Sequence, residues 1–156
     1  MVQSIKRKNN MANRCENNLQ IIGEKKELKK FVKKIKKENF LNSFIPTPKE
    51  LVNTRAPSIK KNLNLIIKYG ADNWYDWNIK NWGTKWDFEI KEEIEIEENE
   101  INLQFDTAWA PPLEGLKNIS LIYPKISFLL NYNEQGMGLK GLSKIKNGLI
   151  IIPIIN

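Results

Sequence analysis

The sequence predicts an α+β domain in which an antiparallel sheet carries its helices on one face. Several short segments alternate apolar and polar residues, as half-buried strands do. Two other segments repeat apolar residues every three or four positions, as amphipathic helices do. Gly, Pro and Asn residues separate these segments. At 156 residues, 41% of them hydrophobic, the chain is long enough for one domain with a sizeable core.

The first strand and the first helix are expected near the beginning of the chain. Residues 15–22 alternate and end at Gly23, which predicts a strand in which Cys15 is a small buried residue. Residues 24–38 predict a helix with one apolar stripe and a basic surface. The stripe is formed by Leu28, Phe31, Val32 and Ile35, and the surface includes Lys26, Lys29, Lys30 and Lys33.

Residues 40–82 are expected to be a helical, Trp-rich insertion. Pro46, Pro48 and Pro57 predict a loop over 42–57. Within the insertion we expect, in order, a short turn at 48–52, a helix over 58–69 closed by Gly70, and a short helix over 72–80 capped by Asp72 or Asn73.

The second half of the chain predicts three or more strands and one helix. Alternation predicts strands over 88–96 and 101–109, with 97–100 as the hairpin turn between them. We then expect a helix that Pro111 and Pro112 open and Pro124 stops, a strand over 126–132, and a final strand or hairpin over 139–152 around Asn147-Gly148.

Without the insertion, the order is strand, helix, strand, strand, helix, strand. This is the ferredoxin-like split βαβ order, an antiparallel sheet with both helices on one face. The opposite face must be solvated, covered by the insertion, or used for binding. We expect a single domain over 13–156, preceded by a flexible basic arm over 1–12 in which Met11 is an alternative start.

Composition excludes several kinds of chemistry. The chain has no histidine, which removes imidazole bases, Ser-His triads and His-containing zinc sites. A single cysteine allows no internal disulfide or Cys-rich metal site and suits a reducing cytoplasm. No apolar run approaches the ~20 residues that span a bilayer, and no secretory leader is visible. We therefore expect no cofactor, no resident metal, no catalytic residues and no membrane contact.

Several motifs carry a resemblance to a known family. The sequence reads Met11-Ala12-Asn13-Arg14-Cys15-Glu16-Asn17, then Asn73-Trp74-Tyr75-Asp76-Trp77 followed by Asn81-Trp82-Gly83-Thr84-Lys85-Trp86, then Phe105-Asp106-Thr107-Ala108-Trp109-Ala110-Pro111-Pro112, and Glu134-Gln135-Gly136-Met137-Gly138. In this order, over roughly 11–141, they resemble the YubB-type ferredoxin-like family of phages and plasmids. The resemblance implies the ferredoxin-like fold and a mobile-element origin. It implies no iron–sulfur cluster and no activity.

Charge is unevenly distributed along the sequence. Residues 1–70 carry a net charge of +12, residues 71–106 a net charge of −8 and residues 107–156 a net charge of +3, which together make +7. This predicts a molecule with a basic lobe and an acidic lobe. The lysine-rich helix is either a solvated face or an electrostatic footprint for RNA or DNA. The acidic segment 89–100 is either a solvated edge or a surface that docks on a basic groove of a nucleic-acid enzyme.

Aromatic and polar residues of the motifs are the other candidate binding residues. Either they form a second small core, with the insertion folded over the open sheet face, or they line a groove in which some of the rings meet a ligand. These residues are Trp74, Tyr75, Asp76, Trp77, Asn81, Trp82, Lys85, Trp86, Asp106 and Trp109.

Three functions follow from these patterns. The first is a non-enzymatic mobile-element protein that binds a host protein or ribonucleoprotein complex handling nucleic acid, as a counter-defence inhibitor does. The second is an accessory protein for replication or transfer that binds RNA or DNA through its lysine-rich helix. The third and weakest is a small metal-dependent hydrolase built on Asp76 and Asp106, with Asp87 as a further carboxylate ligand.

Overall fold

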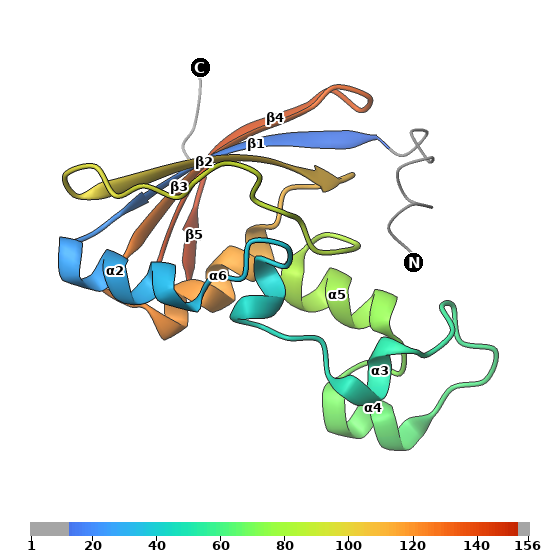
Figure 1. Ribbon diagram of the computed structural model, residues 1–156. Coiled ribbons are helices and arrows are strands. Elements are labelled where there is room, and N and C mark those ends of the chain that lie inside the picture. Colours follow the sequence, from blue (N-terminus) through green and yellow to red (C-terminus); the bar gives the residue numbers. More distant parts are fainter. Residues whose placement is uncertain (1–12, 153–156) are drawn as a thin grey trace.

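The computed structural model of the protein describes residues 13–152, which form an α+β domain with a ferredoxin-like core (Figure 1). Its antiparallel sheet has five strands in the order β2-β1-β3-β4-β5. The strands are β1 (Arg14–Ile22), β2 (Glu100–Ala108), β3 (Ser127–Glu134), β4 (Leu139–Lys146) and β5 (Leu149–Ile151). The sequence predicted this fold class, and the prediction is confirmed.

Strand β1 lies between β2 and β3 and pairs with both. Leu19 of β1 is opposite Leu103 of β2 on one side and Leu130 of β3 on the other. All three side chains are buried on the same face of the sheet. Because successive side chains of a strand point to opposite faces, their neighbours in sequence point to the open face. The chain leaves β2, crosses β1 through one helix and returns as β3, which is the predicted split βαβ connection.

The helices α2 (Lys25–Lys34) and α6 (Leu113–Ile122) cover one face of the sheet (Figure 1). Phe31 of α2 packs edge-on against Tyr123, at the end of α6, with ring centroids 5.2 Å apart. Helix α2 ends about one turn earlier than the predicted 24–38, because Ile35 is extended and the N–H of Lys36 is taken by the hydroxyl of Ser43. The predicted apolar stripe is correct, with Leu28 and Phe31 buried.

The insertion contains a 3₁₀ turn and three helices. These are Leu41–Ser43 (η1), α3 (Lys49–Val52), α4 (Leu63–Tyr69) and α5 (Trp74–Trp82). Helix α4 begins five residues later than predicted, because the Asp72 carboxylate holds the hydroxyl of Ser58 and the N–H of Asn62 in a loop. Asn73 caps α5, accepting from the N–H of Asp76 at 2.9 Å.

The position of the insertion corrects one expectation. It lies on the helix side and extends beyond one end of the sheet, so it does not fold over the open face (Figure 1). Helix α5 packs against α6 instead, and Gly115 of α6 lies so close to Trp82 that a Cβ there would be 3.3 Å from the Trp82 carbonyl oxygen. The open face therefore presents polar side chains such as Asn18, Gln104 and Asn131 to solvent.

The predicted strand over 88–96 is wrong. Residues 88–96 form neither a strand nor a bridge, and the bridge between Glu97 and Glu100 lies just after them, at the start of β2. The backbone of this segment forms hydrogen bonds with residues 37–40 next to the helix layer instead. The N–H of Ile90 donates to the carbonyl of Lys37 at 2.8 Å, and the N–H of Phe40 donates to the carbonyl of Phe88 at 3.1 Å. Phe88 and Ile90 are buried, as the alternation predicted, although their segment does not pair with another strand.

The expected C-terminal hairpin is confirmed as β4 and β5. Asn147 and Gly148 form its turn, and both have positive φ (48° and 78°), as the turn type that suits a two-residue hairpin requires. Glycine and asparagine adopt this conformation with the least strain, which explains why this dipeptide marks the hairpin in the sequence.

Candidate functional site

The outer edge of β2 is the sheet edge where the expected strand is missing. The N–H of Trp109 donates to the carbonyl of Asn13. Together with the register of the two strands, this bond shows that the odd-numbered positions of β2 are the ones hydrogen-bonded to β1. The backbone groups of the even-numbered residues therefore point outward. At the two ends these groups are satisfied by the Glu97–Glu100 bridge and by the Thr84 hydroxyl, which donates to the carbonyl of Ala108 at 3.0 Å.

A groove of about 1120 Å³ lies along this edge. One wall is the segment 86–92, which the helix layer holds away from the sheet, and the other is the second half of β2. The groove continues over the ends of β1 and β3. It is lined by Asn13, Arg14, Glu16, Trp86, Asp87, Phe88, Glu89, Lys91, Glu92, Gln104, Phe105, Asp106, Thr107, Ala108, Glu134, Gln135 and Gly136.

The groove is acidic, because six carboxylates and only two cationic side chains line it. Three of the carboxylates have structural partners. Asp87 accepts from the N–H groups of Leu41 and Asn42, both at 2.7 Å. Glu134 holds the turn at 136–137, and Asp106 pairs with Arg14 at 3.5 Å. The other three, Glu16, Glu89 and Glu92, are exposed; Glu92 also accepts from the N–H of Gln104 at 3.1 Å, and Glu16 and Glu89 add negative charge that faces solvent.

Aromatic side chains continue from the groove toward α5. The Lys85 ammonium lies 4.5 Å from the ring of Trp86 and 5.9 Å from the ring of Tyr75. Tyr75 in turn meets Trp74 edge-on at 5.8 Å. These four side chains are half-buried or exposed. They form a row of three aromatic rings and one lysine, and exposed Trp and Tyr side chains are enriched in protein interfaces.

Trp109 stands at the end of the groove beside Ala108 and Asn13. Its side chain is 55% exposed, and its backbone has φ of 72°, in the left-handed region. A bulky residue in this region costs about 1–2 kcal/mol. The indole is only partly buried, so Trp109 combines a costly backbone conformation with an exposed ring and remains a candidate binding residue.

Two of the predicted tryptophans belong to the core. Trp77 and Trp82 are only 7% and 3% exposed and meet edge-on at 5.9 Å. The indole N–H of Trp82 donates to the carbonyl of Ile45 at 2.8 Å. The Trp-rich motif therefore contributes some rings to the core and others to the surface, and contact of the surface rings with a ligand stays a prediction.

The polar residues of that motif have local structural roles. Asn81 donates to the carbonyl of Trp77 at 2.9 Å within α5. The carboxylate of Asp76 accepts from the amide of Asn73, the residue that caps α5. Neither residue lines the groove.

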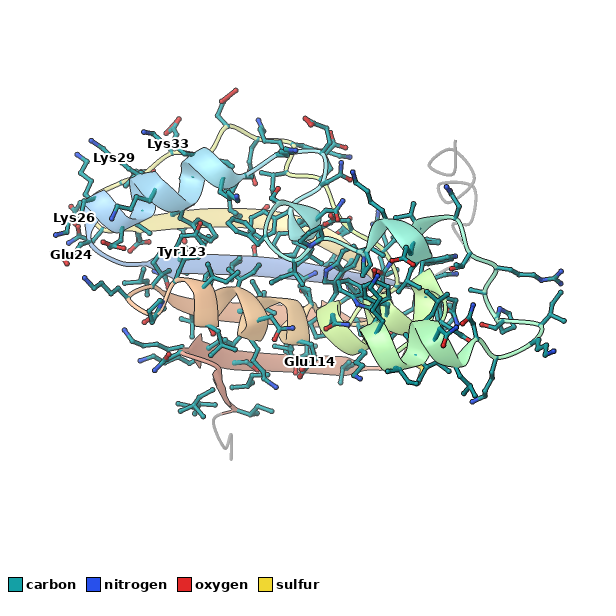
Figure 2. All side chains as sticks on the ribbon, turned by 90° about the horizontal axis from the view of Figure 1, so that it is seen from below. Glu24, Lys26, Lys29, Lys33, Glu114 and Tyr123 are labelled. Carbon is teal, nitrogen blue, oxygen red and sulfur yellow. The ribbon has the colours of Figure 1, made fainter. Side chains whose placement is uncertain are left out.

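The lysines of α2 lie outside the groove. Lys26, Lys29 and Lys33 point outward along the edge of α2 that faces away from α6 (Figure 2), and Lys30 pairs with Glu27 at 3.7 Å. The acidic segment lies next to this helix, where Glu93 pairs with Lys37 at 3.9 Å. The expected separation into a basic lobe and an acidic lobe is therefore wrong, because hydrogen bonds between 37–40 and 88–90 bring opposite charges side by side.

The three aspartates of the hydrolase hypothesis do not come together, because Asp87 and Asp106 line the groove and Asp76 does not. Asp76 belongs to the start of α5, Asp87 to the turn before Phe88, and Asp106 to β2. Across residues 13–152, no three acidic or cysteine side chains come close enough to hold a metal ion. Cys15 is fully buried beside Asn17 and Thr107, and burial raises the pKa of its thiol to about 11, as its predicted structural role requires.

The groove itself was not predicted from the sequence. Glu16 and Gln104 were strand residues without an assigned role, and Glu89 and Glu92 were assigned to the acidic segment and not to a cavity. The available signal was the density of glutamates over 89–100, which is unusual for a segment expected to lie inside a sheet.

Comparisons with known proteins bear on the fold. Residues 82–155 match the model of a family described as a ferredoxin-like domain in Api92-like protein. This part of the chain, which contains β2 to β5 and both walls of the groove, is similar to that domain. No curated protein matches the chain.

A solved structure extends the likeness to nearly the whole chain. The crystal structure of a protein Api92 from Yersinia pseudotuberculosis aligns with a TM-score of 0.59, over 93% of this chain and 99% of that chain. The two sequences are 11% identical, so this likeness concerns the fold alone. Within residues 13–152 no helix is long and apolar enough to cross a membrane.

Proposed function

We propose that the protein is a binding protein without catalysis of its own, and that the acidic groove beside β2 holds a basic surface of a partner protein. The observation that carries the proposal is the groove, which combines exposed carboxylates with an open strand edge and has the exposed Trp109, at positive φ, next to its lining residue Ala108. Exposed aromatic rings beside a charged groove are typical of protein interfaces, where rings anchor and charges steer.

The partner class we infer is a protein that handles nucleic acid. Such proteins carry lysine- and arginine-rich surfaces that neutralise phosphates. The exposed carboxylates that line the groove, Glu16, Glu89 and Glu92, compete for the same cations. The resemblance of the motifs to a phage and plasmid family supports a mobile-element origin, a host protein or ribonucleoprotein complex as the target, and an inhibitory, counter-defence role.

The test is affinity capture from host lysate with a matched pair of charge-reversed variants. Glu16→Lys with Glu89→Lys reverses two exposed groove carboxylates. Glu95→Lys with Glu98→Lys makes the same change in charge at exposed positions that do not line the groove. We expect the first pair alone to lose the partner, and added RNA or DNA to release it from the unmodified protein. Recovery of the same proteins by both variants would contradict the proposal.

A second candidate function is direct binding of RNA or DNA through α2. It is favoured by Lys26, Lys29 and Lys33, whose side chains are free of the sheet and point away from the domain (Figure 2). Lysines spaced along one helix can neutralise several phosphates. The carboxylates next to α2 weaken this field, which is why we rank this function second.

A further inference from the structure

We infer that the partner segment binds in the groove as an extended strand, hydrogen-bonded to the outer edge of β2, and that it alternates cationic and apolar side chains. This inference rests on the proposed function. It adds the conformation and the side-chain pattern of the bound segment.

The first support is the state of the backbone along the edge. Asn102, Gln104 and Asp106 direct their N–H and carbonyl groups away from β1. In the described part of the chain, the outward groups of Asn102 and Asp106 make no hydrogen bond, and Gln104 uses only its N–H, with the Glu92 carboxylate as acceptor. An open edge of this kind is the template to which extended peptides add as a further strand.

The second support is the space beside the edge. In a complete ferredoxin-like sheet, a strand from the segment before β2 would occupy this position. Here the bonds of Ile90 to Lys37 and of Phe40 to Phe88 hold that segment in the helix layer. The groove of about 1120 Å³ is what remains. A strand needs about 4.8 Å beside its neighbour and rises about 3.3 Å per residue, so a short extended segment suits this space.

The third support is the chemistry of the two sides of the edge. Side chains of an added strand alternate between the same two faces as those of β2. On the open face they meet Glu16, Gln104 and Asp106. On the helix side they meet the edges of the stacked rings of Phe88 and Phe105, which line the groove with 5% and 6% of their surface exposed and whose centroids are 3.9 Å apart. Cationic residues suit the first face and apolar residues the second.

Charge disfavours other occupants. A second copy of this edge would bring its own carboxylates, and a nucleic acid would bring phosphates, so both are repelled. Residues 1–12 of the chain itself include Lys6, Arg7 and Lys8, so on charge alone they could occupy the groove in place of a partner. The experiment therefore uses the full chain together with a variant that begins at Met11.

The probe is a labelled peptide of about eight residues that alternates lysine and valine, long enough to cover the open edge. We expect it to bind the full chain and a glutamate–valine peptide to fail. On binding, amide exchange of Asn102 and Asp106 should slow about tenfold or more, while Leu103 and Phe105, already paired with β1, should not change.

Matched peptides separate strand addition from charge attraction. Methylation of the backbone nitrogens at the lysines or at the valines removes alternate donors without changing charge. One of the two peptides should lose about tenfold or more in affinity and the other should not, because only one set of donors faces β2. This comparison does not depend on any variant of the protein.

Three results would overturn the inference. If neither methylated peptide is weakened, or if the amides of Asn102 and Asp106 do not respond, the groove binds cations without adding a strand, and the proposed function survives. If no peptide binds either form of the protein, the strand inference fails, while groove-dependent capture from lysate still reports on the proposed function. If only the variant beginning at Met11 binds, residues 1–12 and not a partner are the occupant.

Discussion

The side-chain carboxylate of Glu92 accepts a hydrogen bond from the backbone N–H of Gln104 at 3.1 Å. In a complete sheet, this outward N–H would donate to a carbonyl of the next strand. A single side chain meets that need here, at one position, while the backbone around Glu92 stays out of the ladder. The missing edge strand and the open groove are therefore two aspects of one arrangement.

Replacing Glu92 by alanine should expose the N–H of Gln104 and speed its amide exchange, which hydrogen-exchange measurements can detect. We expect a loss of about 0.5–1.5 kcal/mol in the free energy of unfolding, because one hydrogen bond is removed. Glu92→Gln is the control, since its amide oxygen still accepts. Unchanged exchange at Gln104 in the alanine variant would show that Glu92 does not protect it.

Asn17 should be important for stability. It is buried, and its amide donates to the carbonyl of Cys15 at 3.0 Å and to the hydroxyl of Thr107 at 3.0 Å, which ties β1 to β2. Asn17→Ala should lower the free energy of unfolding by about 1–3 kcal/mol, because buried polar groups lose their partner. Asn18→Ala, on the exposed face of the same strand, should change it by about 0.5 kcal/mol or less. Urea denaturation compares the two, and equal losses would contradict the assignment.

Asp72 should contribute to the loss of stability in acid. Hydrogen bonds from the Ser58 hydroxyl, the Asn62 N–H and the Asn73 amide lower the pKa of its carboxyl from 3.8. Because the folded pKa is below the unfolded one, the stabilisation is present above about pH 3.8 and is lost as pH falls through the lower folded value. Asp72→Asn should therefore be less stable than the unmodified protein at neutral pH, and the difference should shrink in acid. Urea midpoints measured from neutral pH downward test this, and a constant difference would disprove it.

Two substitutions of Trp109 should have different effects on stability but the same effect on binding. Glycine relieves left-handed strain at φ of 72°, whereas alanine keeps it, so Trp109→Gly should be about 1 kcal/mol more stable than Trp109→Ala. Both variants should bind the partner or the lysine–valine peptide more weakly, because both lose the exposed ring. Thermal unfolding and peptide titration measure the two effects. Full binding by both variants would remove Trp109 from the site.

The direct nucleic-acid function predicts a dependence on α2. If it is correct, the protein binds a mixed pool of short RNA and DNA with a steep salt dependence, and the combined change of Lys26, Lys29, Lys30 and Lys33 to glutamate abolishes binding. The matched control changes four exposed lysines of the insertion to glutamate: Lys49, Lys60, Lys61 and Lys80. Absence of binding at low salt by the unmodified protein would leave the protein partner as the function to pursue.

Local chemistry explains which parts of the fold were predictable. Asn73 caps α5, Gly70 and Gly83 end α4 and α5 at positive φ, and Asn147-Gly148 turns the last hairpin. Each of these depends on the conformational preference of one or two residues, which does not need the rest of the molecule. Helix α2 was placed correctly from its periodic apolar stripe. Its end was not, because that end depends on Ser43 from a later turn.

The candidate site was predictable only in part. The motifs drew attention to Trp86, Asp106 and Trp109, which do lie in or beside the groove. They gave equal weight to Trp77 and Trp82, which are core residues. Whether an indole of α5 is buried depends on how α5 packs against α6, and this packing cannot be predicted from the local sequence.

By itself, the sequence determined the fold class, the order of most elements, the buried face of each strand and the absence of histidine chemistry. These follow from periodicity and composition, which are properties of the chain alone. Only the tertiary structure decided that Phe88 and Ile90 are buried without forming a strand. Alternation predicts which side chains are buried. Strand formation depends instead on the partners of the backbone N–H and carbonyl groups, and those of Ile90 and Phe88 bond to Lys37 and Phe40. These bonds left the edge of β2 open and created the groove.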